Sequence, residues 1–248
     1  MSRDGTFAVA CRVLHQLRHD RRSIAMVLIA PLFLLWVLQL TFEGAPGVFE
    51  RVGPMLLGTF PFTTMFLVTS ITMLRERNQG TLDRAMVSPI GRGDIMAGYA
   101  LAFLVLATVQ SALALGFSRW VLDMPIQGSL WQVLVVVLAL AMYGTMLGLT
   151  LSAFAQTEFQ AVQFMPLFLL PQIFLSGLLV PTEAMATALE WISTVIPLRY
   201  SFEVLVGVML QGRSMWTSDL AGSLAVTLLI PVALVFLGSL TMKRSTAN

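Results

Sequence analysis

Residues 130–154 read LWQVLVVVLALAMYGTMLGLTLSAF, a run without Asp, Glu, Lys or Arg. A helix needs about 20 apolar residues to cross roughly 30 Å of hydrocarbon, so this run is long enough to cross a bilayer once. Five more runs of this kind occupy residues 24–42, 52–74, 95–118, 159–180 and 220–242. The sequence therefore predicts an all-α integral membrane protein with six transmembrane helices.

The composition agrees with a membrane protein. Of the 248 residues, 57% are hydrophobic and 11% are charged, whereas a soluble domain carries about 25% charged residues. The net charge of +2 is spread over a long apolar chain, which argues against nucleic-acid binding. The single cysteine, Cys11, cannot form an internal disulfide.

The positive charges are unevenly divided between the two sides of the predicted membrane. Eleven of the 15 Lys and Arg residues fall in the N-terminal segment, in residues 75–94 and at the C-terminus. The opposite side holds Arg51, Arg119, Arg199 and Arg213. The positive-inside rule then places both termini in the cytoplasm.

Residues 1–23 have the pattern of a helix that lies in the cytoplasmic membrane interface. Apolar residues recur at helical spacing, at Phe7, Ala10, Cys11, Leu14 and Leu17. Arginines supply the polar surface, near anionic headgroups. Cys11, His15 and His19 share one side of this helix, but structural zinc needs four ligands and no fourth is evident, so we expect no metal site.

The connection at residues 75–94 contains the segment RERNQGTLDRAMVSP at 75–89. Thr81 can cap a short helix, Leu82 and Met86 fall on one face, and Pro89 prevents its continuation. A small amphipathic helix here is well placed to pass force between a cytoplasmic partner and the membrane helices. The alternative is an ordinary charged loop that only sets the topology.

Residues 181–219 carry too many charges for a membrane span, and Pro197 separates two short apolar faces. This pattern predicts a re-entrant helix pair before the sixth span, which could close the external end of a pathway. An amphipathic hairpin resting on the membrane fits the periodicity equally well.

The predicted spans contain only mildly polar side chains. Candidates for a substrate pathway are Gln39, Thr64, Gln163, Gln172 and Ser176. Such groups also serve as interhelical hydrogen-bonding partners. No Asp, Glu, Lys, Arg or His lies within a span, which disfavours coupling to an ion gradient.

Catalytic signatures are missing from the sequence. The only lysine, Lys243, lacks the glycine pattern of a Walker motif, so the chain cannot hydrolyse ATP alone. No G-x-S-x-G or H-E-x-x-H occurs, which disfavours an intramembrane enzyme.

Three features together resemble the ABC-2-type transporter permeases, which are membrane subunits of bacterial exporters and include the daunorubicin-resistance-like drug and lipid exporters. Residues 75–89 are similar to the family's E-R-x-x-G-T-L-x-x-L-x-x-x-P coupling-helix signature, with Ala85 where leucine is frequent. LSGLLVP at 175–181 and IPLRY at 196–200 are similar to its S-G-x-x-x-P and P-L-x-Y segments, with Ala186 where proline is frequent. The third feature is the layout of the whole chain, residues 1–248, as one transmembrane domain.

The resemblance implies an exporter permease in the bacterial plasma membrane that works as a homodimer or heterodimer with two ATP-binding subunits. ATP and Mg²⁺ would bind those subunits, and this chain would hold no cofactor. The residues that would couple to the ATPase are Glu76, Arg77, Gly80, Thr81, Leu82, Asp83, Arg84, Met86 and Pro89. The residues of an external gate would be Gly177, Pro181, Pro197 and Tyr200.

The uncharged interior indicates a hydrophobic or amphipathic cargo, a drug or a lipid, because a strongly charged one would find no compensating partner. A polysaccharide or glycolipid is the alternative within the class. An ATP-independent membrane scaffold and an intramembrane enzyme are the alternatives from other classes.

Overall fold

The computed structural model describes residues 3–45, 47–79 and 92–241, and all regular secondary structure in these residues is helical. The predicted coupling residues Gly80, Thr81, Leu82, Asp83, Arg84, Met86 and Pro89 lie outside the described residues. Glu76 and Arg77 are described.

Six long helices correspond to the six apolar runs. They are α2 (Arg21–Thr41), α3 (Val48–Asn78), α5 (Arg92–Trp120), α6 (Leu130–Ser152), α7 (Glu158–Leu175) and α10 (Ser218–Thr241). The first five are apolar and long enough to cross a membrane. α10 has 24 residues, about 36 Å at the helical rise per residue, which also suffices. The fold class predicted from the sequence is therefore confirmed.

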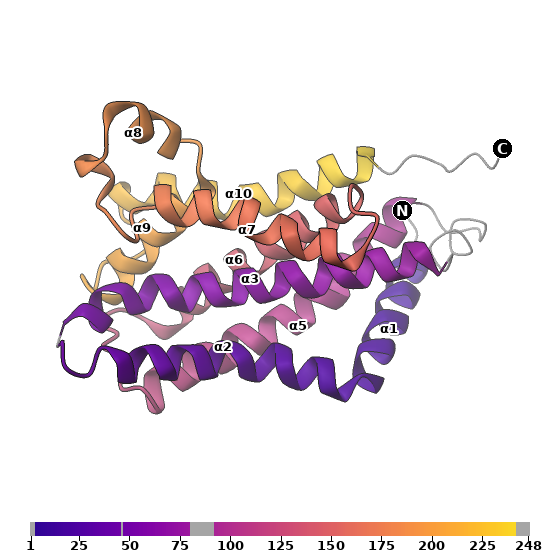
Figure 1. The fold of residues 1–248 in the computed structure, drawn as a ribbon, viewed down its shortest axis with the longest axis horizontal. Coiled ribbons are helices and arrows are strands. Elements are labelled where there is room, and N and C mark those ends of the chain that lie inside the picture. Colours follow the sequence, from indigo (N-terminus) through magenta and orange to yellow (C-terminus); the bar gives the residue numbers. More distant parts are fainter. Residues whose placement is uncertain (1–2, 46, 80–91, 242–248) are drawn as a thin grey trace.

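The remaining helices lie at the two ends of this bundle. α1 (Arg3–His19) precedes α2, and the α7–α10 connection holds η1 (Thr182–Ala184), α8 (Thr187–Ser193) and α9 (Pro197–Met209). The end of α3, the start of α5 and the end of α10 gather beside α1, at what we call the α1 end (Figure 1). The α2–α3 and α5–α6 connections, α8 and α9 lie at the opposite, α8 end.

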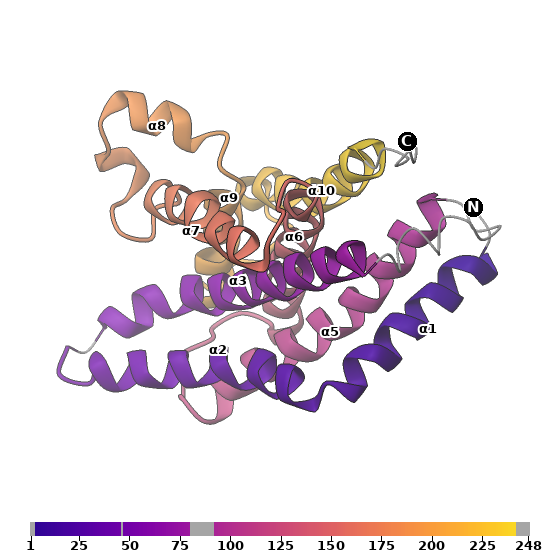
Figure 2. The same cartoon turned by 45° about the vertical axis from the view of Figure 1, so that its right-hand side comes forward.

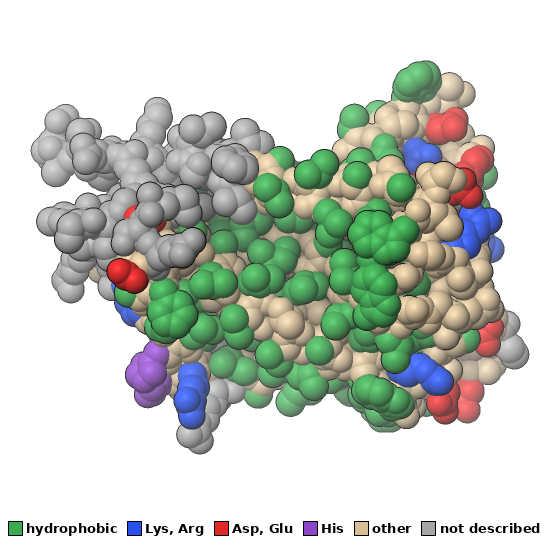
Figure 3. Space-filling model, turned by 180° about the vertical axis from the view of Figure 1, so that it is seen from behind, with side chains coloured by type: hydrophobic (Ala, Val, Ile, Leu, Met, Phe, Trp, Pro, Cys, Tyr) green, Lys and Arg blue, Asp and Glu red, His purple; other side chains and the backbone are tan. Residues whose placement is uncertain are grey.

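The surface matches the environment expected for such a bundle. A broad band of apolar side chains separates charged side chains at the two ends (Figure 3). The buried charged residues among the described side chains are Glu76 and Asp94, which lie just outside the apolar runs 52–74 and 95–118. The described part of the protein is thus uncharged inside over the depth of the band.

Close packing of α6 on α3 forms the centre of the bundle. A Cβ atom added to Gly144 would lie 2.1 Å from the carbonyl oxygen of Phe62, and one added to Gly148 would lie 2.5 Å from that of Phe66. The spacing G-x-x-x-G lets two membrane helices approach backbone to backbone. Only glycine fits at these two positions.

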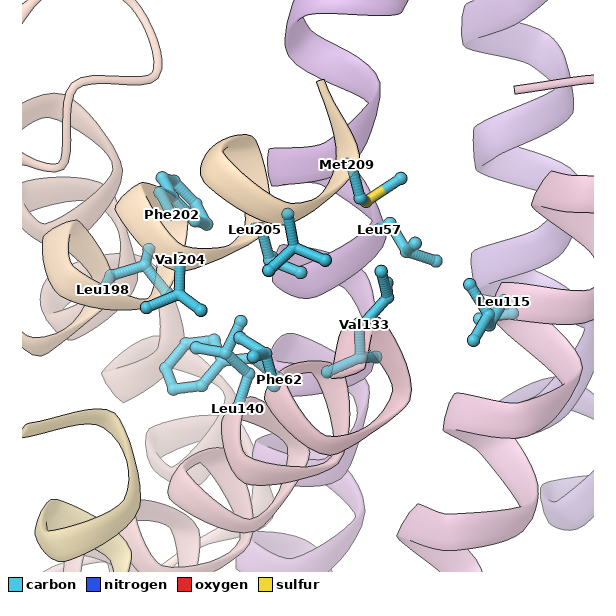
Figure 4. Close-up of a cluster of buried hydrophobic side chains, with 14 of the residues drawn as sticks. Leu57, Phe62, Leu115, Val133, Leu140, Leu198, Phe202, Val204, Leu205 and Met209 are labelled. Atoms are coloured by element: carbon cyan, nitrogen blue, oxygen red, sulfur yellow. The ribbon is translucent and has the colours of Figure 1, made fainter. Parts of the chain in front are cut away.

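α9 completes the core at the α8 end. Its buried residues Leu198, Phe202, Leu205 and Met209 recur at helical spacing. They pack against residues of α3 and α6, including Leu57, Phe62, Val133 and Leu140 (Figure 4). Pro197 occupies the first turn of α9, where its fixed φ angle favours a helix start.

α8 and α9 form a bent pair, with an angle of 83° between them. α7 ends and α10 begins at the α8 end, so the pair leaves and returns to the same end of the bundle. α8 projects from the bundle (Figure 2) and leaves Trp191 and Val195 about three-quarters exposed. One face of α9 is buried against the bundle, and a re-entrant position of the pair in the membrane remains a prediction.

Most helix bounds differ from the apolar runs by one to three residues, and the larger differences are in α3 and α7. α3 extends beyond residue 74 to Asn78, because no residue there stops the helix. α7 ends at Leu175 instead of continuing to residue 180. Gly177 follows with a φ angle of +91°, a left-handed conformation that terminates helices and that glycine adopts at little cost.

Candidate functional site

Three consecutive charged residues end α3 where it leaves the apolar band: Arg75, Glu76 and Arg77, here called the RER triplet. Successive residues of a helix point about 100° apart, so neighbouring charges cannot share one direction. In the structure, each of the three side chains contacts a different part of the bundle.

Glu76 faces inward and is only 2% exposed. Its Oε2 lies 3.3 Å from Nη2 of Arg12 on α1, and the same nitrogen donates a hydrogen bond of 2.8 Å to the hydroxyl of Tyr99 on α5. A buried carboxylate is costly unless it is paired and hydrogen-bonded. Arg12 therefore stabilises the charge of Glu76 and joins α3 to both α1 and α5.

Arg77 points to the end of α6. Its guanidinium donates to the carbonyl oxygens of Ser152, at 3.0 Å, and Ala153, at 2.9 Å, and also to that of Ala155. The last carbonyls of a helix lack partners within the helix and carry partial negative charge, so a cation is favourable there. Arg77, on a neighbouring helix, thus supplies hydrogen-bond donors to the last carbonyl groups of α6.

Arg75 points to the start of α7. Its Nε and Nη2 atoms lie 2.7 and 2.9 Å from the two carboxylate oxygens of Glu158, the first residue of α7. Both side chains are about half exposed. The geometry is bidentate, but exposed ion pairs contribute little stability.

Apolar packing lies next to these polar contacts. Leu74, Ala155 and Ala161 are each fully buried and form a small cluster, with Phe164 packed against it. This cluster joins α3, the α6–α7 connection and α7. The connection is therefore held to α3 both by its carbonyl groups and by its side chains.

α1 docks onto α5 rather than facing the interface with all of its apolar residues. Val9, Ala10 and Val13 are buried, while Phe7 is 64% exposed. A Cβ atom on Gly98 of α5 would lie 2.6 Å from the Cβ of Val9. The buried face of α1 therefore differs in part from the predicted apolar face. Because Gly98 has no side chain, Val9 can pack against the backbone of α5. The periodicity of α1 alone does not reveal this contact.

The predicted pathway residues Gln39, Thr64 and Ser176 each donate a hydrogen bond to a backbone carbonyl group of the described chain. Gln39 donates to the carbonyl of Leu122 at 2.8 Å, and Thr64 donates to that of Phe60 at 2.7 Å. Ser176 donates to the carbonyl of Ile173. Gln163 is exposed on α7. A role in transport remains a prediction for each of them.

Gln172, the fifth pathway candidate, makes a buried contact between helices. Its Oε1 accepts a hydrogen bond of 3.0 Å from the hydroxyl of Tyr143 on α6, and its Nε2 donates to the carbonyl of Phe168. Side chains of this kind join membrane helices. The contact agrees with the alternative role given for such residues in the sequence analysis, a hydrogen bond between helices.

The predicted gate residues shape the turns of the α7–α9 region. Gly177 follows α7, Pro181 precedes η1 and Pro197 begins α9. The hydroxyl of Tyr200 donates to the carbonyl of Thr194. Gly177 and Pro181 thus lie in the connection from α7 to η1, whereas Pro197 and Tyr200 lie at the corner between α8 and α9.

Sequence reasoning missed the charged residues at this corner. Arg199 donates to the hydroxyl of Ser193 at 2.6 Å and pairs with Glu203 at 3.3 Å. Glu203 in turn accepts a hydrogen bond of 2.6 Å from Ser223 on α10. The i,i+4 spacing of Arg199 and Glu203 is a signal that could have found the pair.

Several helices long and apolar enough to cross a bilayer, with a band of apolar side chains between two charged ends, define a multi-pass membrane protein. Residues 5–210 match the family described as ABC-2 type transporter, and the chain belongs to this family. The resemblance stated from the 75–89 and 175–200 segments is thereby confirmed.

Individual relatives agree with this assignment. The chain is 32% identical over 172 residues to the "Probable multidrug ABC transporter permease YbhR" of Escherichia coli (strain K12), covering 67% of the chain and 46% of the relative. It is 24% identical over 189 residues to the "Linearmycin resistance permease protein LnrN" of Bacillus subtilis (strain 168), covering 74% and 48%. It is also 24% identical over 199 residues to the "ABC transporter G family member 20" of Dictyostelium discoideum, covering 80% and 27%. The chain thus spans about half or less of the length of these relatives.

Proposed function

We propose that this chain is the permease subunit of an ATP-driven exporter that moves a hydrophobic or amphipathic drug or lipid across the plasma membrane. Membership of the ABC-2 type transporter family, matched over residues 5–210, carries the proposal. The names of two relatives, a multidrug permease and a linearmycin resistance permease, favour a drug-like cargo.

The energy source is a separate subunit in this proposal. Membership of the ABC-2 type transporter family supports ATP and Mg²⁺ binding to two partner subunits that associate with a dimer of permeases. The partner contacts are Gly80, Thr81, Leu82, Asp83, Arg84, Met86 and Pro89. Closure of the ATP-binding subunits biases the membrane helices between two states, since a ligand shifts an equilibrium only through its different affinity for the two states.

The orientation follows from the charges. The end of the bundle with α1 and the RER triplet faces the cytoplasm, in agreement with the positive-inside rule. The α8–α9 corner then lies on the external side. Gly177, Pro181, Pro197 and Tyr200 belong to the external gate in this orientation.

The cargo class follows from the interior. The described buried side chains at the depth of the apolar band carry no charge, so a strongly charged cargo would lose its hydration without finding a partner. An amphipathic molecule keeps its polar part near the ends of the bundle.

The proposal is tested with the native complex. Affinity purification of the chain from its own membranes should recover an ATP-binding subunit. Inside-out vesicles that contain the complex should then take up a fluorescent amphipathic dye in an ATP-dependent manner. Recovery of the chain alone would favour a scaffold. Turnover of a lipid by the chain without partners would favour an enzyme.

A further inference from the structure

The RER triplet joins the end of α3 to two separate groups of helices. One group is reached through Glu76, which contacts Arg12 on α1 and Tyr99 on α5. The other is reached through Arg77 and Arg75, which contact the end of α6 and the start of α7. A single turn of one helix therefore contacts four others.

Glu76 is not available as a contact for another protein. Its side chain is 3% exposed, and Arg12 covers it while remaining 40% exposed itself. The pair lies where α3 leaves the apolar band, and the burial of Glu76 penalises separation of its carboxylate from Arg12. Displacement of the end of α3 without α1 therefore separates this buried carboxylate from the guanidinium of Arg12.

Arg77 makes an equally specific connection. Its planar guanidinium offers several donors in a fixed fork, and it serves the carbonyl oxygens of three residues, Ser152, Ala153 and Ala155. The buried cluster of Leu74, Ala155 and Ala161 lies at the same joint. The α6–α7 connection therefore follows the end of α3.

We propose that the RER triplet is a branching joint, which passes movement of the end of α3 to α1 and α5 through Glu76 and to α6 and α7 through Arg77. Glu76 and Arg77 are positioning residues inside the permease rather than contacts of the ATP-binding subunit. The inference rests on the proposed function, because the movement comes from ATP binding by a partner. Because Glu76 acts on α1 and α5 and Arg77 acts on α6 and α7, the two connections can be tested separately.

The experiment uses the complex of permease and a cysteine-free ATP-binding subunit in lipid nanodiscs. Cys11, the only cysteine of the chain, is exposed on α1 and accepts an environment-sensitive fluorophore without mutation. A second version carries Cys11→Ser and Phe159→Cys, which places the fluorophore on an exposed position of α7. The measurement is the change in fluorescence when ATP and vanadate trap the closed ATPase.

The expected result is a crossed pattern. Glu76→Gln should reduce the ATP-dependent fluorescence change at Cys11 by about fivefold or more, which is the lower end of ordinary coupling between sites. The fluorescence change at position 159 should stay near the value measured without the Glu76→Gln substitution. Arg77→Ala does the reverse. Both variants still bind the ATP-binding subunit. The exposed Arg18→Gln on α1 is the matched control and leaves both signals unchanged.

Exchanging the charges of Arg12 and Glu76 distinguishes a positioning role of the pair from a general loss of folded protein. Arg12→Glu alone and Glu76→Arg alone should lose the signal at Cys11, and the double exchange should restore at least part of it, because the pair is re-formed. A merely structural role predicts loss of folded protein and not a loss of signal at one label alone.

Three results would overturn the inference. They are equal loss at both labels in every variant, unchanged signals in every variant, and failure of folded Glu76→Gln to bind the ATP-binding subunit. Absence of partner binding by the unmodified chain is a different outcome, since it removes the proposed function itself and with it this inference.

Discussion

Arg12 on α1 and Glu76 on α3 lie 64 positions apart in the sequence, yet their side chains meet at 3.3 Å. Glu76 is buried and Arg12 is partly exposed. Through this pair and the hydrogen bond from Arg12 to Tyr99, α1 is connected to α3 and α5. The sequence patterns show both charges but not their contact.

Removal of Arg12 should destabilise the protein more than removal of another arginine of α1. Arg12→Ala removes the guanidinium that lies 3.3 Å from the buried carboxylate of Glu76, a loss of about 1–3 kcal/mol after allowance for the exposure of Arg12. Thermal unfolding in detergent measures the difference. Arg18→Ala is the control, and an equal effect of the two variants would contradict the role of the pair.

Gly144 should tolerate no side chain. Gly144→Ala places a Cβ atom 2.1 Å from the carbonyl oxygen of Phe62 and forces α6 away from α3. We expect a loss of about 1–3 kcal/mol, typical of overpacking. Gly222→Ala is the control, because nothing lies within 4 Å of that position. An unchanged melting temperature for Gly144→Ala would show that the helices are less closely packed.

Arg75 should matter least for stability within the RER triplet. Its pair with Glu158 is about half exposed on both sides, so Arg75→Ala should cost no more than about 1 kcal/mol. The remaining effect should fade in high salt, because exposed charges are screened. Thermal unfolding at low and high ionic strength tests this, and a loss as large as that of Arg12→Ala would contradict it.

Tyr143 and Gln172 should behave as a coupled pair. Tyr143→Phe and Gln172→Leu each remove the buried hydrogen bond between α6 and α7, so the double variant should be less destabilised than the sum of the single ones. We expect a coupling of about 0.5–1.5 kcal/mol. Additive losses in a double-mutant cycle would show that the contact does not form in the membrane.

The sequence predicts the long helices because lipid leaves the backbone no other partner for its hydrogen bonds. It also identified Glu76 and Arg77 as special, through their place in a motif. It could not predict their partners, because the carbonyls of Ser152 and Ala153 have no sequence signature. The burial of Val9 instead of Phe7 likewise depends on the space at Gly98, on another helix.

Three glycines carry sequence patterns that could have predicted further features of the fold. Gly144 and Gly148 have the spacing of a helix-packing motif, and Gly177 is a helix-terminating residue in a position to end α7. For the predicted pathway residues, the sequence pattern was too weak to distinguish a transport role from a structural one. Polarity alone selected Gln39 and Gln172, and both have partners within the described chain.

If the proposed function is right, this chain transports only when a partner subunit hydrolyses ATP. The direct measurement is dye uptake by proteoliposomes that contain the chain alone, the chain with its ATP-binding subunit, or the chain with a subunit whose Walker lysine is replaced. We predict ATP-dependent uptake against a gradient only in the second preparation. Uphill uptake by the chain alone, or equal uptake with the inactive subunit, would contradict the account.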